Sequence, residues 1–590
     1  MHMLNLKFII LLIIINCSLS ANNSKLPFEL EVKKDIKSLL NNNYEDLLIS
    51  KKNLNDYYVK NDYSAYWIDK NGIKSIGLSL INRIKNDPVL KPHINKIFRL
   101  DEVEKNLNSL DKSDSKYLEK IVKIDFMLTE LFDRYVTYIS KGSIKWNEFE
   151  EKLAEREKQT EIKATWDKYS LKEDPKQLLK KVVEKNDLLD VLNGLDFNYP
   201  QVKELISAID ELEKISANGG YTKVPESKSL RIGDVSEVLP ILRKRLAQSK
   251  DLNTQCENTQ NEQSIINDNT NTINTSTEQE NSENVKLRAN CENIFDEDLK
   301  NAVISFQKKH GLFADGIVGT QTQRFINISA SKKIAIIRLN LERMRWLPRN
   351  LGEKYLLVNI PEYRLKLYEN DEVKLNMAVI VGDAKFPTPI FSDKMSYVVL
   401  NPNWNIPDSI AKNELIPKLL KDPNYLADKG IDIYAGWNGG TEKIDSKDVL
   451  DSAILQDEEY LKSFRFSQNS NKDNPLGKMK FMFPNKHAVY LHDTPAKYLF
   501  ANARRAFSHG CIRLSKPQDL LTTIADEDSN LDIDKANDIL ANVTSEKAIG
   551  LNKKIPIHIV YLTSWVDENG VLQFREDIYN FDKLQKEFLL

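Results

Sequence analysis

Apolar residues recur every three or four positions through most of residues 27–225, and this spacing predicts amphipathic helices. The clearest stretch, 118–135, includes Leu118, Val122 and Phe126 on one face. Glu and Lys fill the intervening positions, and no run alternates apolar and polar residues as a half-buried strand does. We therefore predict an all-α N-terminal scaffold domain over 27–225. A partner-binding surface is the alternative role for the same helices.

The helical spacing continues over 228–330, but it is interrupted. The predicted faces are Val235, Val238, Leu239, Leu242 and Leu246, then Leu299, Val303 and Phe306, with a third short helix over 320–326. The interruption at 251–290 contains ten Asn and neither an aromatic residue nor Pro. Such a composition cannot bury enough apolar area to offset chain entropy, so we expect a disordered insertion within a three-helix module.

From about residue 335 the period changes from helix to strand. After a predicted helix at 335–346, strand-like runs occupy 354–360, 363–368, 373–381, 395–400, 488–491, 555–563 and 571–579. Short strands at this density, separated by Pro and Gly, predict a mainly β domain over 335–590. The segment 405–475 interrupts the strands and contains a predicted helix at 410–420. We expect it to be an inserted subdomain that forms a mobile cap. The fold class is therefore multidomain α+β.

The N-terminus carries a different pattern. Lys7 precedes an apolar run from Phe8 to Ile15, and small residues follow it. This arrangement predicts a secretory signal peptide over 1–20 and an exported, periplasmic protein. An uncleaved segment would instead associate the chain with the membrane, and Cys17 raises the alternative of lipidation.

Charge and cysteine content narrow the function classes. The 590 residues contain 84 Lys and Arg against 86 Asp and Glu, so no basic footprint indicates a nucleic-acid partner. Of the four cysteines, Cys17 lies in the signal, and Cys256 and Cys291 flank the insertion. We predict that this flanking pair forms a disulfide, which leaves Cys511 unpaired in an oxidising compartment.

Histidines gather near that cysteine. Of seven His in the chain, His487, His492 and His509 lie within 24 residues of Cys511. An imidazole can take the proton of a thiol and leave a nucleophilic thiolate, so the grouping favours thiol catalysis. A buried structural cysteine is one alternative. A zinc site is another alternative, which the lack of a short metal-binding spacing disfavours.

Two sets of strings resemble known families. Ile232-Gly233-Asp234, the run from Leu299 to Leu312 and the run from Ala314 to Gly319 resemble the three-helix peptidoglycan-binding domain of bacterial wall enzymes. Leu491-His492-Asp493-Thr494-Pro495 and the run from Ser508 to Leu514 resemble the signature of L,D-transpeptidases with the YkuD-type fold.

Further strings resemble the large, three-part branch of that family. They are the runs 340–348, 388–392, 401–407 and 476–485. The resemblance implies a catalytic domain over 335–590 with the capping subdomain at 405–475. It also implies an enzyme that acts in cell wall organisation and cell shape by cross-linking peptidoglycan stem peptides.

The implied chemistry is a cysteine acyltransfer without a cofactor. The cysteine attacks the bond after the L-centre of diaminopimelate in a donor tetrapeptide, and D-alanine leaves. The side-chain amine of an acceptor stem then resolves the thioester to a 3→3 cross-link. Carbapenem-type β-lactams are the implied covalent inhibitors.

The resemblance also implies roles for single residues. Cys511 is the nucleophile, His492 the base, and Asp493 the group that orients the base by its side chain or its carbonyl. Gly510 and Cys511 offer backbone N–H groups for an oxyanion hole, and His509 supports it.

Three further residues are expected at the substrate: Tyr490, Ser508 and Arg513. Arg513 would bind a substrate carboxylate, with a structural pairing in the turn as the alternative. Tyr490 and Trp404 line the groove or belong to the core. Three functional alternatives stay open: an L,D-carboxypeptidase, attachment or cleavage of a protein at the wall, and a non-catalytic wall-anchoring protein.

Overall fold

The computed structural model divides the chain into two compact units, 1–87 with 94–136 and 173–192, and the remainder. It describes residues 27–41, 51–91, 94–160, 165–168, 173–196, 199, 201–253, 291–436, 442–454 and 458–587. The predicted signal and Cys256 lie outside these residues, as does the side chain of Cys291, so the predicted disulfide stays a prediction. Nearly all of the predicted insertion lies outside them too.

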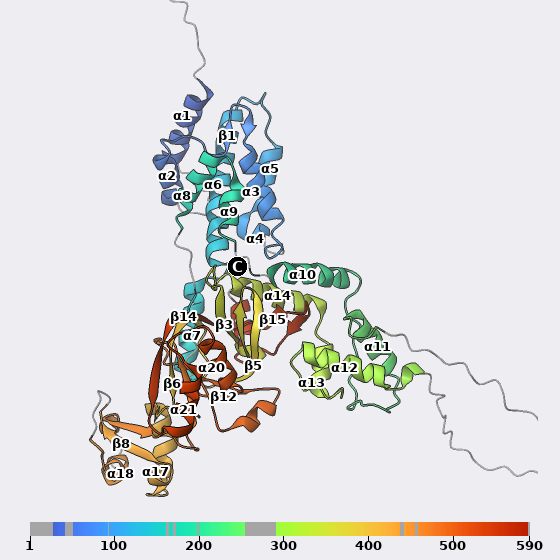
Figure 1. Ribbon diagram of the computed structural model, residues 1–590. Coiled ribbons are helices and arrows are strands. Elements are labelled where there is room, and N and C mark those ends of the chain that lie inside the picture. The colour runs from blue at the N-terminus through green and yellow to red at the C-terminus, as the bar shows by residue number, and fades with distance from the viewer. Residues whose placement is uncertain are drawn as a thin grey trace, which may run out of the picture. The chain divides into compact units, whose positions relative to one another are not determined.

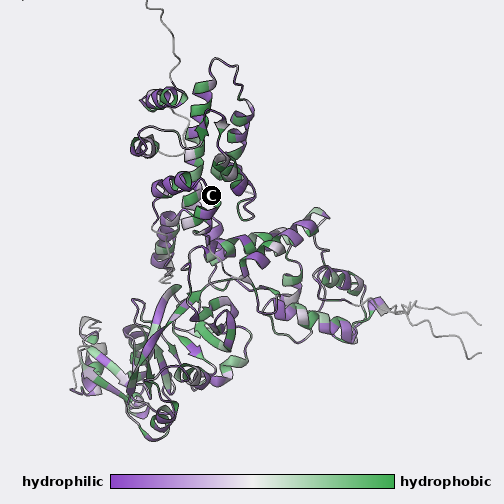
Figure 2. Ribbon diagram, turned by 45° about the horizontal axis from the view of Figure 1, so that its top comes forward, coloured by the Kyte–Doolittle hydropathy of each residue, from purple (hydrophilic) through white to green (hydrophobic). Residues whose placement is uncertain are grey.

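The first unit is helical, as predicted (Figure 1). Its elements are α1 (Phe28–Asn41), α2 (Lys51–Lys60), β1 (Ile68–Asp69), β2 (Gly72–Ile73), α3 (Ser75–Lys85), α4 (Ile94–Phe98), α5 (Leu100–Asn108), most of α6 (Tyr117–Lys141), α8 (Pro175–Lys185) and α9 (Leu188–Asn193). Its helices carry both hydrophilic and hydrophobic residues, as amphipathic helices do (Figure 2). The buried Asp125 accepts hydrogen bonds from Tyr58 Oη at 2.7 Å and Trp67 N at 2.7 Å, which satisfies its carboxylate inside the core.

The predicted scaffold segment contributes to both units. Helices α7 (Trp146–Thr160) and α10 (Gln201–Ala217) belong to the second unit, where α10 packs on α14 (Ala330–Met344). Leu205, Ile209 and Leu212 of α10 share a buried cluster with Ile337 and Leu341 of α14. The helical period alone predicts that one face of the helix is buried, but it does not identify the element against which that face packs.

The peptidoglycan-binding-like module has the three predicted helices, α11 (Leu239–Gln248), α12 (Glu297–Lys309) and α13 (Thr320–Ile326), with the short η1 (Cys291–Asn293). Leu299, Val303 and Phe306 of α12 are buried as predicted, and Asp296 caps the helix by accepting from Leu299 N at 2.8 Å. Val235 differs from the prediction. It precedes α11, pairs with Ile294 and is 56% exposed.

A nine-stranded sheet forms the C-terminal domain, in the order β12-β5-β13-β11-β10-β6-β14-β3-β4. Its strands are β3 (Lys354–Asn359), β4 (Arg364–Glu369), β5 (Glu372–Gly382), β6 (Phe391–Leu400), β10 (Met479–Met482), β11 (Leu491–His492), β12 (Ala506–Ser508), β13 (Ile512–Leu514) and β14 (Lys547–Val560). An additional pairing of β4 with β5 closes the sheet on itself. Its core includes Val379, Phe481, Leu491 and Ile512.

The shorter elements of this domain complete it. They are η2 (Ile360–Glu362), η4 (Lys497–Ala501), α20 (Pro517–Ala525), α21 (Ile533–Asn542), β15 (Ser564–Val566), β16 (Leu572–Phe574) and α22 (Phe581–Lys586). Two strand predictions need correction: the run 488–491 contributes only Leu491 to β11, and the run 571–579 only the short β16. Ala488 has a φ of 54°, a left-handed backbone that a strand cannot contain.

The predicted inserted subdomain lies between β6 and β10 in the chain. It comprises β7 (Trp404–Asn405), α15 (Asp408–Ile410), the π-helical turn η3 (Ala411–Leu415), α16 (Ile416–Leu419), α17 (Tyr425–Asp428), β8 (Ile431–Ala435), α18 (Ser446–Ile454), α19 (Glu458–Leu461) and β9 (Phe464–Gln468). Strand β9 pairs with both β7 and β8, and a separate apolar cluster forms beneath them. Its movement as a cap stays a prediction.

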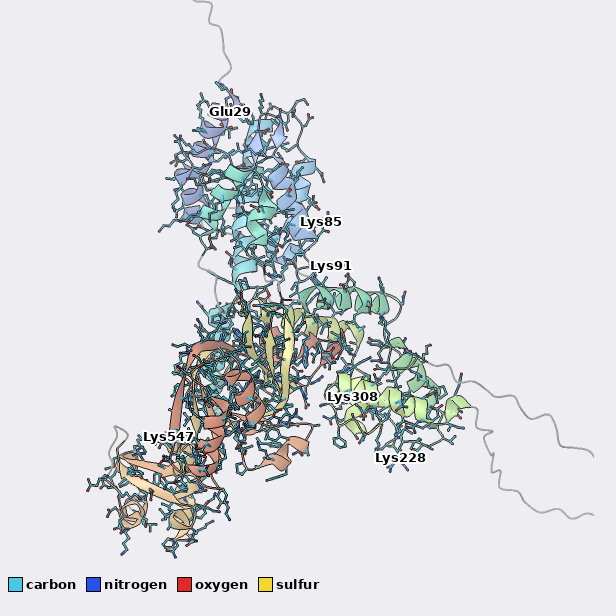
Figure 3. All side chains as sticks on the ribbon, viewed as in Figure 1. Glu29, Lys85, Lys91, Lys228, Lys308 and Lys547 are labelled. Carbon is cyan, nitrogen blue, oxygen red and sulfur yellow. The ribbon has the colours of Figure 1, made fainter. Side chains whose placement is uncertain are left out.

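Charged side chains are spread over the chain rather than gathered. Exposed lysines such as Lys85, Lys308 and Lys547 lie in different domains (Figure 3). No helix among the described residues is apolar enough over the length that a bilayer requires.

Candidate active site

Cys511 lies in a tight loop between β12 and β13. Gly510 has a φ of 107°, which a residue with a side chain rarely adopts. Ser508 Oγ donates to the carbonyl of Cys511 at 2.5 Å and accepts from Gly510 N at 3.3 Å. Thr388 Oγ1 donates to the carbonyl of Gly510 at 2.8 Å. These bonds fix the loop around the cysteine.

Strand register places the side chains of His492 and Arg513 on one face of the sheet. β11 and β13 are parallel, with Leu491 opposite Ile512 and His492 opposite Arg513. Because side chains alternate along a strand, His492 and Arg513 point away from the face on which Leu491 and Ile512 are buried. Cys511 and Tyr490 precede these pairs at the same end of the two strands.

His492 is held in one tautomer. Its Nδ1 lies 2.6 Å from the carbonyl oxygen of Asp493, and a carbonyl can only accept, so Nδ1 carries the proton and Nε2 is left with its lone pair. Burial, and secondarily the charge of Arg513, lowers the pKa of His492 to about 3. The imidazole is therefore neutral at rest and able to accept a proton.

The thiol of Cys511 faces the start of β11. Its Sγ lies 3.9 Å from the carbonyl oxygen of Ala488, and the backbone N–H and the hydroxyl of Tyr490 face the side chain. The residue is partly exposed, as a nucleophile must be. Burial of the sulfur raises the pKa of Cys511, and the backbone N–H and hydroxyl of Tyr490 act in the opposite direction. Cys511 N–H has no acceptor among the described residues.

Asp493 contacts His492 through its backbone carbonyl and not through its carboxylate. Its Oδ1 lies 2.6 Å from Lys497 Nζ, and its Oδ2 accepts from Lys478 N at 2.9 Å. Gly477 has a φ of 60°, and a Cβ there would meet Asp493 Oδ2 at 2.3 Å. Of the two orienting routes left open by the sequence, the geometry supports the carbonyl.

His509 points toward the inserted subdomain. Its Nε2 lies 3.0 Å from Glu414 Oε1, and its ring lies 4.5 Å from that of Phe386. Glu414 belongs to the π-helical turn η3. The arrangement supports His492 rather than His509 as the base.

Of the residues expected at the substrate, Arg513 fits best. Its Nε is buried without a partner, and no carboxylate among the described residues pairs with its guanidinium. The alternative of a structural pairing in the turn therefore has no support here. Ser508 is 2% exposed and its hydroxyl is used inside the loop, so a positioning role fits it better than substrate contact.

Tyr490 lies between several groups of the site. Its ring is 5.7 Å from that of His492. Trp404 packs against the core of the inserted subdomain.

The sequence alone assigned no role to Thr388, Glu414 or Lys480. Thr388 and Lys480 do lie in the strings that resemble the family, which was the available signal.

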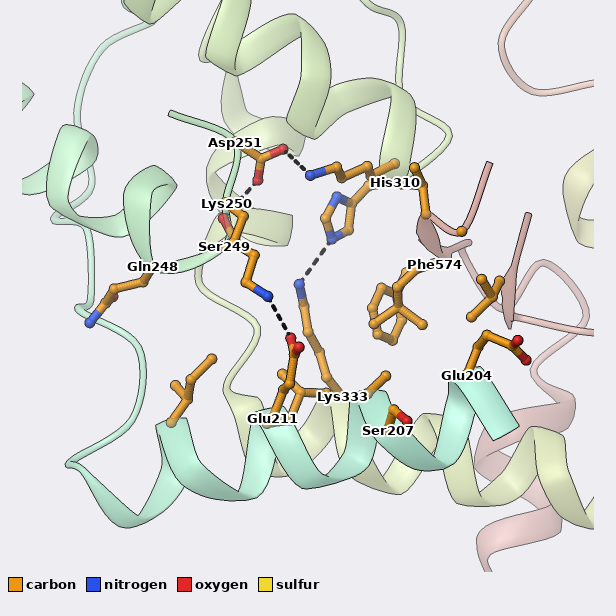
Figure 4. Close-up of a pocket in the computed structure, with 18 of the residues that line it drawn as sticks. Glu204, Ser207, Glu211, Gln248, Ser249, Lys250, Asp251, His310, Lys333 and Phe574 are labelled. Atoms are coloured by element: carbon orange, nitrogen blue, oxygen red, sulfur yellow. Dashed lines mark hydrogen bonds and ion pairs between the residues drawn. The ribbon is translucent and has the colours of Figure 1, made fainter. Parts of the chain in front are cut away.

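A separate cavity of about 520 Å³ lies beside the peptidoglycan-binding-like module. Lys333 Nζ is 3.1 Å from His310 Nε2 (Figure 4). Both side chains are 3% exposed. Burial lowers the pKa of Lys333 to about 7.

Across the described residues, no group of three His, Cys, Asp or Glu is arranged to hold a metal ion.

Comparison with known families agrees with this architecture. Residues 353–533 match the L,D-transpeptidase catalytic domain, YkuD. Residues 52–208 match a scaffold domain, and residues 288–326 match a peptidoglycan binding domain. The chain therefore carries a YkuD-type L,D-transpeptidase catalytic domain together with a scaffold and a peptidoglycan-binding domain.

Individual relatives are similar over part of the chain. A Haemophilus influenzae protein named "Putative L,D-transpeptidase" is 33% identical over 248 residues, which are 42% of this chain and 48% of that protein. The chain thus spans about half the length of the curated relative that it matches.

Solved structures show weaker likeness. An L,D-transpeptidase from Mycobacterium smegmatis is 16% identical with a TM-score of 0.17, over 35% of this chain and 58% of its own. An LD transpeptidase in complex with imipenem is 15% identical with a TM-score of 0.16, over 35% and 59%.

Proposed function

We propose that this protein is a peptidoglycan L,D-transpeptidase that forms 3→3 cross-links between diaminopimelate residues through a thioester on Cys511. The observation that carries the proposal is that a partly exposed thiol and an imidazole with an unprotonated Nε2 lie on two paired parallel strands and the loop that leads into one of them. We place this activity in the periplasm, after export by the N-terminal segment.

In acylation, His492 Nε2 accepts the proton of the Cys511 thiol, and the sulfur attacks the carbonyl carbon of the donor stem. The C–S bond forms, the C–N bond to the terminal D-alanine breaks, and the imidazolium returns its proton to the leaving amine. The Cys511 N–H, free of an acceptor among the described residues, would stabilise the oxyanion. The N–H of Gly510 would join it by releasing its long bond to Ser508.

In the second half-reaction, the acceptor amine attacks the thioester, and the thiolate leaves. His492 takes the proton that the amine loses. Arg513, unpaired among the described carboxylates, would bind a carboxylate of a stem peptide. A water molecule in place of the amine would give an L,D-carboxypeptidase instead.

The deciding experiment uses purified protein and tetrapeptide-rich muropeptides, with products identified by mass. We expect 3→3 dimers from the wild type and none from Cys511→Ala. Tripeptides without dimers would show that the protein hydrolyses the donor stem as an L,D-carboxypeptidase and does not cross-link it. An unaltered substrate pool would leave a wall-anchoring protein as the better description.

Carbapenem-type β-lactams are proposed covalent inhibitors, because their strained acyl group presents the same kind of electrophile to the thiolate. Imipenem should add its mass to the wild type and not to Cys511→Ala.

A further inference from the structure

The catalytic face of the sheet extends beyond β11 and β13 to a third strand. Lys480 of β10 pairs directly with His492 of β11, which pairs in turn with Arg513 of β13. Directly opposed residues of neighbouring strands point to the same face. The next residue along β10, Phe481, is fully buried on the opposite face. Lys480 therefore belongs to the face that carries the proposed base.

The amine of Lys480 lies against Tyr490. Its Nζ is 3.9 Å from the centroid of the Tyr490 ring, a close cation–π contact. The hydroxyl of the same tyrosine faces the Cys511 side chain and favours its ionised form. A cation over the ring draws electron density from the phenol, which makes the hydroxyl a better donor to sulfur. The chain of contacts thus runs from Lys480 through Tyr490 to the nucleophile.

Lys480 has no competing partner in the described part of the chain. No carboxylate there lies within ion-pair distance of its Nζ, although Glu546 acts on its charge from farther away. Burial lowers the pKa of Lys480, and the charge of Cys511 acts to raise it. A partly buried cation without a nearby carboxylate gains most when a negative charge appears beside it. In the proposed mechanism the thiolate of Cys511 is such a charge, and the charge of Lys480 acts in its favour.

We propose that Lys480 is a positioning residue that stabilises the thiolate of Cys511 by acting through Tyr490. The proton of the thiol still goes to His492, and Lys480 keeps its own protons throughout. The same cation favours the thiolate as nucleophile during acylation and as leaving group during resolution. This proposal deepens the acyl-transfer function proposed above and rests on it for the role of Cys511.

The charged and titratable groups around the thiol come from several elements. They are Lys480 on β10, Tyr490 and His492 at β11, Arg513 on β13, and Glu546 before β14, with Lys497 and Tyr498 of η4 acting on His492 and Arg513. The set contains three cations and one acid. The positive charge of Lys480 favours the thiolate, so its removal makes the thiolate less stable. The thiol should then lose its proton at a higher pH.

The test measures the rate at which iodoacetamide alkylates Cys511 as a function of pH, read by intact mass. In Lys480→Met, the alkylation profile should move by about one pH unit to higher pH, which is a tenfold loss of rate at pH 7. Lys480→Arg keeps the cation and should restore most of the wild-type profile. Lys394→Met on neighbouring β6 is the matched control, since Lys394 is exposed and should leave the profile unchanged.

Tyr490→Phe provides the second arm. It should shift the profile in the same direction, and the double variant with Lys480→Met should add little to it, because both act through one path. A wild-type profile in Lys480→Met, with unfolding midpoints matched, overturns the proposal. A fully additive double variant overturns the route through Tyr490. The alkylation needs no wall substrate, so a failure of the muropeptide assay remains a separate result.

Discussion

Two histidines precede the proposed nucleophile, Cys511, in the sequence, and their surroundings distinguish them. His492 is 4% exposed and anchored at Nδ1 by the Asp493 carbonyl. His509 is two residues from Cys511, yet its Nε2 is directed at Glu414. The position of Gly510, with its φ of 107°, turns the chain between His509 and Cys511. Proximity along the chain therefore does not indicate the base.

We expect His492→Ala to slow acylation of Cys511 by imipenem about a hundredfold or more, because general-base catalysis is lost. His509→Ala should cost less than about tenfold, since it removes a supporting contact. Intact mass against time measures both rates, and Cys511→Ala provides the blank. If His509→Ala is not acylated while His492→Ala is acylated at the wild-type rate, His509 and not His492 is the base.

At the scale of elements, a contact joins the inserted subdomain to the loop that carries Cys511. Glu414 lies in the π-helical turn η3, and such turns are frequent at functional sites. Its Oε1 lies 3.0 Å from Nε2 of His509, whose ring also contacts Phe386. The contact gives the predicted cap a residue pair that would hold it over the thioester and keep water away.

Glu414→Gln should weaken this hold and raise the share of hydrolysis over cross-linking about two- to tenfold, the worth of one hydrogen bond. Glu442→Gln in the same subdomain is the control, because Glu442 is exposed. Tripeptide and dimer products are compared by mass. An unchanged ratio in Glu414→Gln would argue that this contact does not govern water access.

At the scale of the whole molecule, stability should depend on the buried Lys333 beside the peptidoglycan-binding domain. Its Nζ lies 4.8 Å from the ring of Phe574, and its polar contact is the buried His310. The adjacent Lys332 is exposed. Because burial lowers the pKa of Lys333 to about 7, the folded state binds fewer protons than the unfolded state between pH 7 and about 10.4.

The wild-type unfolding midpoint should therefore rise between pH 7 and pH 9, since stability increases with pH wherever the unfolded state binds more protons. Lys333→Met should reduce this slope, and Lys332→Met should leave it as in the wild type. Thermal unfolding followed by circular dichroism measures the midpoints. If the unfolding midpoint has the same pH dependence in all three proteins, the pKa of Lys333 is not lowered in the folded state.

The sequence by itself determined the local elements and the chemical groups. Helical spacing predicted α12 and α13, and strand-like runs located β3, β4 and β5 within two residues of their ends. The unpaired Cys511 with nearby histidines, and the strings around it, predicted the nucleophile and the class of catalytic domain that the family match supports. These features are local because periodicity and short motifs depend on neighbouring residues.

The tertiary structure decided what depends on distant pairing. The strands β10, β12 and β13 are only three or four residues long, too short to show an alternation, and they are stabilised by their partners in a closed sheet. The pairing of β11 with β10 and with β13 brings Lys480, His492 and Arg513 into one row. It also decided that the Asp493 carbonyl, and not its carboxylate, orients the imidazole, since strand register and side-chain burial are set by contacts far apart in the chain.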